Sequence, residues 1–162
     1  MVGRLGEIAA EKELLHRGWT VGHFNATVAN TAAYDLFAVK GTRRVCIRVK
    51  TTSGHTVQYT VKSHGSAFNS LEPKDNGDFV VVVLFKENGN SDFYIMPTQV
   101  MDDMLLSSHS LWLKSSKKDG TARKNTSHRS LDFAGQQTKA QPSRGMQVVW
   151  EKYLNNWGVL SG

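Results

Sequence analysis

The sequence lacks the features that fix secreted and membrane-spanning proteins. It has one cysteine in 162 residues, Cys46, which excludes an internal disulfide and any zinc site built from several cysteines. Its longest apolar stretch lies within DFVVVVLF, far short of the roughly 20 residues that cross a bilayer. The first dozen residues include four charged ones, unlike a secretory signal. We therefore expect a cytoplasmic protein with no membrane association.

Nucleotide-binding and zinc-binding motifs are also missing. No glycine-rich phosphate loop occurs, and the six histidines show no zinc-ligand spacing. Acidic residues are few: 14 Asp and Glu stand against 20 Lys and Arg, giving a formal charge of +6 and a pI near 9.6. Such a balance is compatible with a polyanionic partner. The length of 162 residues suits one domain with a core of its own.

Hydrophobic spacing predicts a helix at the start of the chain. The segment GRLGEIAAEKELLHRG has apolar residues at helical intervals and ends on Gly18, which is typical of a helix C-terminus. The stripe expected to face the core consists of Leu5, Ile8, Ala9, Leu14 and Leu15.

Several strands follow this helix. WTVGHF, TVQYTV and SDFYIM read as strands, and the β-branched run DFVVVVLF predicts a strand buried on both faces. YDLFAV and RRVCIRVKT are joined by KGT, which predicts a hairpin. A short helix is expected over about 98–106, and MQVVWEKYLNNWGVL predicts a closing helix. This order indicates an α/β fold: a single domain over 1–162 with a central mixed β-sheet flanked by helices.

The segment 114–144 differs from the rest in composition. It holds eight Lys or Arg and only two Asp, so its local charge of +6 equals that of the whole chain. We expect a mobile basic loop or arm that follows a nucleic-acid backbone. The candidate nucleic-acid-binding residues are Lys117, Lys118, Arg123, Lys124 and Arg129.

The hairpin brings a carboxylate and a lysine together. Alternate residues of a strand share a face, so Arg48 and Lys50 lie opposite Val49. Folding the hairpin places Asp35, at the start of its first strand, beside Lys50 at the end of its second. A carboxylate that holds a divalent metal next to a lysine that handles the attacking water suits phosphodiester hydrolysis. The alternative is an ordinary solvated ion pair.

The stretch GEIAAEKELLHRGW … AYDLFAVKGTRRVCIRVKTT resembles the PD-(D/E)xK nuclease superfamily, and most of all the small archaeal Holliday-junction resolvases and bacterial homing endonucleases. The resemblance covers about the first fifty residues. It implies a restriction-endonuclease-like core in which Asp35 and the helix-borne Glu7 bind Mg²⁺ or Mn²⁺, and Lys50 is catalytic. Tyr34 replaces the motif proline.

One position departs from the family pattern. Arg48 stands where the family has Glu, Asp or Gln, and a guanidinium donates hydrogen bonds but cannot bind a cation. Three explanations compete. Arg48 contacts the scissile phosphate as a catalytic residue while the metal keeps Glu7 and Asp35; or Glu11 or Gln58 supplies the missing oxygen; or catalysis is lost.

These readings predict a divalent-metal-dependent DNA endonuclease that hydrolyses phosphodiester bonds. The alternative is an inactive relative that binds nucleic acid or serves in an assembly. DNA, duplex or branched, is the expected partner. We also expect a homo-oligomer, because cutting two strands needs two sites.

Overall fold

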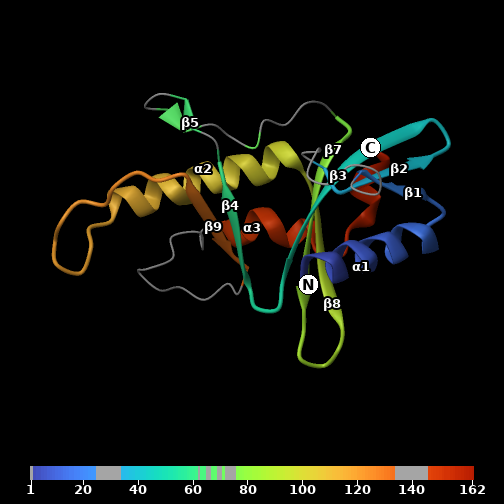
Figure 1. Cartoon of the computed structure of the whole chain (residues 1–162), viewed down its shortest axis with the longest axis horizontal. Helices are drawn as coiled ribbons and strands as arrows, with labels where there is room; N and C mark the ends of the chain where they lie inside the picture. Colours follow the sequence, from blue (N-terminus) through green and yellow to red (C-terminus); the bar gives the residue numbers. More distant parts are fainter. Residues whose placement is uncertain are drawn as a thin grey trace.

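Five strands form one mixed sheet in the computed structural model, which describes residues 2–24, 34–61, 63–64, 67–68, 71, 76–133 and 146–162 (Figure 1). The strand order is β1–β2–β3–β7–β8. Neighbours run antiparallel except for the central pair β3 and β7, which is parallel. The strands span Thr20–His23 (β1), Leu36–Lys40 (β2), Arg43–Thr52 (β3), Asp78–Phe85 (β7) and Ser91–Pro97 (β8).

Both faces of the sheet are covered. Helix α1 (Val2–His16) and the 3₁₀ helix η4 (Trp157–Ser161) pack on one face, and α2 (Thr98–Lys114) with the short α3 (Gln147–Trp150) on the other (Figure 1). Consecutive residues of β7 therefore enter opposite cores, with Val81 in the first and Val82 in the second. This confirms the α/β sandwich and the doubly buried strand expected from the valine run.

The expected core stripe of α1 is confirmed for Leu14 and Ala9 and wrong for its other three residues. Leu5, Ile8 and Leu15 are exposed, each to about half of its surface, while Gly6 and Ala10 are buried together with Leu14. Small side chains let the helix axis approach the sheet closely, so a narrow, weakly apolar face forms the contact. The larger apolar side chains Leu5, Ile8 and Leu15 point to solvent.

Strand β4 (Thr56–Thr60) leaves the main sheet. It pairs antiparallel with β9 (His128–Asp132) in a two-stranded ribbon that packs against α2. The predicted arm is therefore partly regular structure, because β9 lies within it. Residues 134–144 of the predicted arm lie outside the described part of the chain. Two further strands, β5 (Ser63–His64) and β6 (Ala67–Phe68), pair with each other.

Two helix predictions need correction. Helix α2 runs to Lys114 rather than to about 106, and Leu105 and Ser108 are buried along its length. The closing helix is broken: α3 gives way to the 3₁₀ helix η3 (Glu151–Tyr153), and Asn155 takes a φ of 52° before η4 begins. Trp150 and Trp157 pack into different cores, one on each side of the sheet. One continuous helix would place these two residues, seven positions apart, on the same face.

Within the described residues, none of the helices has the length and apolar character needed to cross a membrane.

Candidate active site

Asp35 is fixed at the entry to β2 by three hydrogen bonds. Its backbone N–H donates to the carbonyl of Ile47 over 2.9 Å, and its own carbonyl accepts from the N–H of Phe24 over 3.0 Å. Its side-chain Oδ2 accepts from the backbone N–H of Val49 over 2.7 Å. The carboxylate is thereby held against β3, as the hairpin register requires.

Strand β3 presents Arg48 and Lys50 on the face opposite the α1 core. Val45, Ile47 and Val49 pack toward α1, so the predicted alternation is confirmed. Burial raises the pKa of Asp35 and the Val49 hydrogen bond lowers it. The charge of Glu7 raises it further, and Lys50 and Arg48 lower it. The structure thus brings Glu7, Arg48 and Lys50, the other three predicted catalytic residues, within electrostatic range of Asp35.

Glu7 reaches the site from α1. Its Oε2 accepts from the Nη1 of Arg4 over 2.7 Å on the same helix. The charge of Glu7 raises the pKa of Asp35, because two carboxylates near each other repel. A cation between the two carboxylates would stabilise this arrangement.

A glycine sets the distance of Glu7 from the sheet. A Cβ built on Gly6 would lie 1.8 Å from the Oγ1 of Thr51 and 2.8 Å from its Cβ. No side chain fits there, so the close approach of α1 to β3 depends on Gly6.

We expect Gly6→Ala to lower stability by about 2 kcal/mol, the cost of overpacking, and to move Glu7 away from Asp35. Gly3→Ala is the matched control on the same helix, because a Cβ there meets nothing within 4 Å. Urea unfolding should show a lower free energy of unfolding for Gly6→Ala than for the wild type, and no decrease for Gly3→Ala. Equal midpoints for the two variants would contradict this account of the helix approach.

Arg48 has a partner inside the protein. Its Nη2 donates to the Oδ2 of Asp78 over 3.1 Å and its Nε to Oδ1 over 3.4 Å. Its guanidinium also lies 4.8 Å above the ring of Tyr34. Asp78 opens the neighbouring strand β7, with its side chain 1% exposed. Arg48 is thus the counterion of a buried carboxylate.

Two hydroxyls complete this network around Asp78. Thr98, at the start of α2, donates to Oδ1 over 2.6 Å, and Tyr34 donates to Oδ2 over 2.9 Å. Burial and the Asp78 hydrogen bond raise the pKa of Tyr34 to about 12. Asp78 was not predicted as a site residue from the sequence. The available signal was a lone carboxylate opening a strand that is otherwise apolar, next to a strand with an unmatched arginine.

Similarity to solved structures was found at the level of the fold. The structure of a bacterial homing endonuclease, I-Ssp6803I, matches with a TM-score of 0.52 and 16% identity over 98% of this chain and 90% of that one. A Holliday junction resolvase, Hjc from Archaeoglobus fulgidus, matches with a TM-score of 0.44 and 16% identity over 80% of this chain and 83% of that one. The chain shares its fold with that homing endonuclease. No family model and no curated protein matches its sequence.

Within this fold, the two candidate replacement ligands do not join Asp35. The Oε2 of Glu11 pairs with the Nε2 of His23 over 3.0 Å. Gln58 is exposed on β4, between the buried residues Val57 and Tyr59. Tyr59 lies under Lys50, so strand alternation directs Gln58 away from the site. A migrated ligand is therefore not supported at either position.

Two carboxylates remain to hold a metal. Within the described residues, no group of three His, Cys, Asp or Glu side chains is placed to hold an ion. Mg²⁺ keeps several waters and is commonly bound through one or two carboxylates. The pair Glu7 and Asp35, whose charges act on each other, has the oxygen chemistry for such a site.

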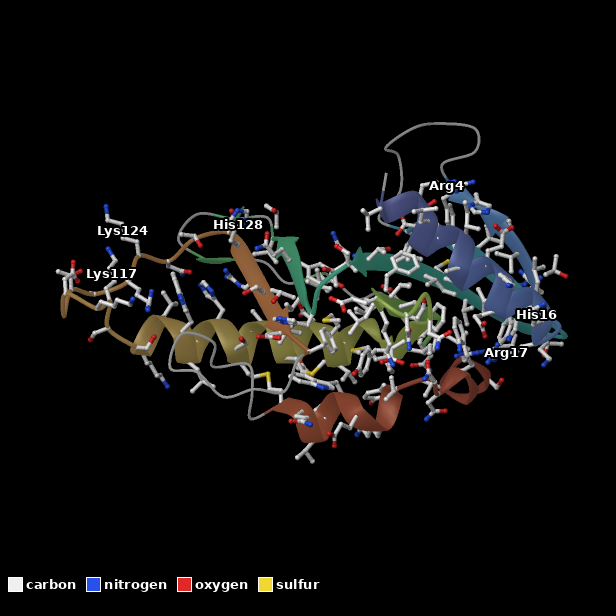
Figure 2. All side chains as sticks on the ribbon, turned by 90° about the horizontal axis from the view of Figure 1, so that it is seen from below. Arg4, His16, Arg17, Lys117, Lys124 and His128 are labelled. Carbon is white, nitrogen blue, oxygen red and sulfur yellow. The ribbon has the colours of Figure 1, made fainter. Side chains whose placement is uncertain are left out.

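The basic segment divides into exposed and packed residues. Lys117, Lys118 and Lys124 are exposed in the loop after α2, at the opposite end of the molecule from α1 (Figure 2). Arg123 packs 4.8 Å over the ring of Trp112 and donates from Nε to the carbonyl of Ser115 over 2.9 Å.

Arg129, one of the predicted nucleic-acid contacts, differs from the loop lysines because it is buried. It is 3% exposed on β9 and its Nη1 donates to the carbonyls of Thr126 and His128. Its guanidinium secures the start of the ribbon. Burial lowers its pKa.

Proposed function

We propose that this protein is a divalent-metal-dependent DNA endonuclease that hydrolyses phosphodiester bonds. The observation that supports the proposal best is the carboxylate of Asp35, which the Val49 N–H holds against β3 and whose pKa responds to the charges of both Glu7 and Lys50, in a fold shared with a homing endonuclease. Glu7 and Asp35 would hold Mg²⁺ or Mn²⁺, which supplies positive charge to offset the negative charge that develops on the phosphate.

Lys50 acts on the reacting groups. Its ammonium has donors for the attacking water or a phosphate oxygen, and its charge opposes the charge that builds up during attack. The water oxygen forms a new bond to phosphorus as the bond to the leaving oxygen breaks. The proton of the water passes to solvent, and the leaving oxygen gains one in turn.

Arg48 is not assigned a phosphate contact in this proposal. Its guanidinium is bound to Asp78 through Nε and Nη2, and its side chain is 13% exposed. It stabilises the central strand pair that carries Lys50, and its positive charge lowers the pKa of Asp35.

A second candidate function is nucleic-acid binding without cleavage, as a subunit of a larger assembly. The arginine at position 48 favours it, because the usual third ligand is then absent from β3. Binding that is sensitive to salt and indifferent to metal would distinguish this function.

The deciding experiment is cleavage of supercoiled plasmid and of a panel of branched DNAs in Mg²⁺, Mn²⁺ and EDTA. We expect cutting in either metal and none in EDTA. Direct conversion of plasmid to linear product would support two paired sites, and hence the homo-oligomer, which stays a prediction. Binding to these DNAs without cutting in any metal would favour the second function.

The loop lysines should carry a large share of DNA affinity. Each phosphate contact contributes about 0.9 to the slope of log K against log salt. We expect the triple variant Lys117→Gln, Lys118→Gln, Lys124→Gln to reduce that slope by about 2 to 3. Fluorescence anisotropy with a short duplex in EDTA, over about 50 to 200 mM salt, measures the slope independently of cleavage.

Lys86→Gln with Lys152→Gln is the control, because both side chains are exposed and lie outside the loop. The slope of this control should match the wild type. Equal slopes for the wild type and the triple variant would remove the loop from the binding surface. Arg123 is left unchanged, because its contact with Trp112 would mix lost packing with lost charge.

A further inference from the structure

A buried tyrosine lies directly beneath the catalytic lysine. Tyr59 belongs to β4, is 5% exposed, and is part of the core between the sheet and α2. Its hydroxyl is buried and, within the described part of the chain, has no hydrogen-bond partner. A buried hydroxyl without a partner costs about 1 to 3 kcal/mol, so apolar packing alone would favour phenylalanine here.

The ring of Tyr59 contacts the ammonium of Lys50. The Nζ lies 4.8 Å from the ring centroid. This is within the range in which a ring face attracts a cation. Only residues 53–55 join β3, which carries Lys50, to β4, which carries Tyr59. Strand β4 therefore turns back and places its inward face below the end of β3.

The hydroxyl is also close to the other charges of the site. Burial raises its pKa far above the ordinary range, Arg48 lowers it, and Asp35 raises it. The phenol therefore stays neutral, which excludes Tyr59 as a base or a nucleophile and leaves a neutral ring face for Lys50.

We propose that Tyr59 is a positioning residue whose ring face holds the Lys50 ammonium in place for phosphodiester hydrolysis. This inference rests on the proposed function. A lysine side chain has four rotatable bonds, and without a second contact its head would sample many positions. The ring restricts that head to the end of the strand, near the carboxylate of Asp35.

The same contact joins the ribbon to the catalytic sheet. Tyr59 pairs across the ribbon with Arg129 of β9, and the loop with Lys117 and Lys124 leads into β9 (Figure 2). Figure 1 places β4 between β9 and the central strands. The element that carries the basic loop thus also carries the support for Lys50.

Two substitutions separate the ring from the hydroxyl. Tyr59→Phe keeps the ring, and Tyr59→Leu removes it while keeping an apolar side chain. Tyr94→Leu is the matched control, because Tyr94 is a similarly buried tyrosine of the same core that packs on Phe133.

The first readout is the proton chemical shift of the Lys50 side-chain methylenes, measured by NMR in the metal-free protein. The ring should shift these signals upfield in the wild type, in Tyr59→Phe and in Tyr94→Leu, and the shift should vanish in Tyr59→Leu. This readout does not depend on cleavage. A Lys50 signal that is unchanged in Tyr59→Leu would overturn the proposal whether or not the protein is a nuclease.

The second readout is the rate of DNA cleavage at saturating substrate. We expect kcat to fall about tenfold or more in Tyr59→Leu, since small misplacements of a catalytic group carry that cost, with KM little changed. Tyr59→Phe and Tyr94→Leu should keep the wild-type kcat. If kcat falls as much in Tyr59→Phe as in Tyr59→Leu, the hydroxyl is the group that acts, and positioning by the ring is refuted. If the wild type does not cleave DNA, the proposed function is refuted, and the NMR shift alone then tests the contact between Tyr59 and Lys50.

Discussion

Asp35→Asn should abolish metal-dependent DNA cleavage while leaving the protein folded at least as stably as the wild type. The asparagine Oδ1 can still accept the Val49 N–H, now bonded to the carboxylate over 2.7 Å. The negative charge on which metal binding depends is lost. Several kcal/mol of charge stabilisation correspond to a rate lower by about a thousandfold or more.

The stability of this variant has a definite pH dependence. The pKa of Asp35 is raised, chiefly by burial, so the folded protein holds this proton more tightly than the unfolded chain does. The wild type therefore loses stability as the pH rises through the ordinary aspartate value toward neutral. In EDTA, the free energy of unfolding of Asp35→Asn should exceed that of the wild type by an amount that grows as the pH rises and disappears in acid.

Plasmid cleavage in Mg²⁺ and chemical unfolding across pH are the two measurements. Asp92→Asn is the control, since it removes a carboxylate that is paired with Lys86 on the β7–β8 hairpin. Full cleavage by Asp35→Asn in a clean preparation would refute the metal-site assignment. Loss of both folding and cleavage would mean that the charge of Asp35 has a structural role.

Asp78→Asn should destabilise the protein by about 3 to 5 kcal/mol, the usual cost of breaking a buried ion pair on one side. An amide offers one acceptor oxygen where the carboxylate offers two. The donors of Arg48, Tyr34 and Thr98 all point at this group. The guanidinium would also remain part-buried without its counterion.

A double-mutant cycle tests this coupling. Adding Arg48→Gln to Asp78→Asn removes the unpaired charge, so the double variant should be more stable than the sum of the single changes predicts. Urea midpoints of the four proteins give the coupling energy. Additive effects, or an Asp78→Asn midpoint equal to the wild type, would contradict the network as described.

The network also changes how Arg48→Glu should be interpreted. That substitution restores the carboxylate typical of the family, but it places a second negative charge against buried Asp78. We expect an unfolded or strongly destabilised protein, so missing activity in it would say nothing about the arginine. Arg48→Gln avoids the clash of charges and offers an amide oxygen toward the metal position.

Local pattern predicted the parts of the site that are local in the chain. Asp35 and Lys50 lie on one hairpin, and strand alternation with a short turn determines their relative position. The alternation of Val45, Ile47 and Val49 against α1 follows from the same rule. The part of the candidate site on this hairpin was therefore predictable.

The remaining part depends on contacts between distant segments. Arg48 meets Asp78 across a parallel strand pair, and Tyr59 meets Lys50 because β4 turns out of the sheet. The spacing of apolar residues along the sequence carries no information on either contact. The stripe of α1 failed for a related reason: close packing of Gly6 against Thr51, rather than apolar area, decides which face is buried.

The parallel pairing of β3 with β7 also sets an order of assembly during synthesis. Asp35 reaches Val49 across 14 residues, whereas Arg48 reaches Asp78 across 30. Contacts of short sequence separation form first, and a growing chain releases α1 and the hairpin before β7 exists. On the ribosome, the hairpin that carries Asp35 and Lys50 can form early. Its central strand then waits for β7, so the ion pair between Arg48 and Asp78 forms only after Asp78 has been made.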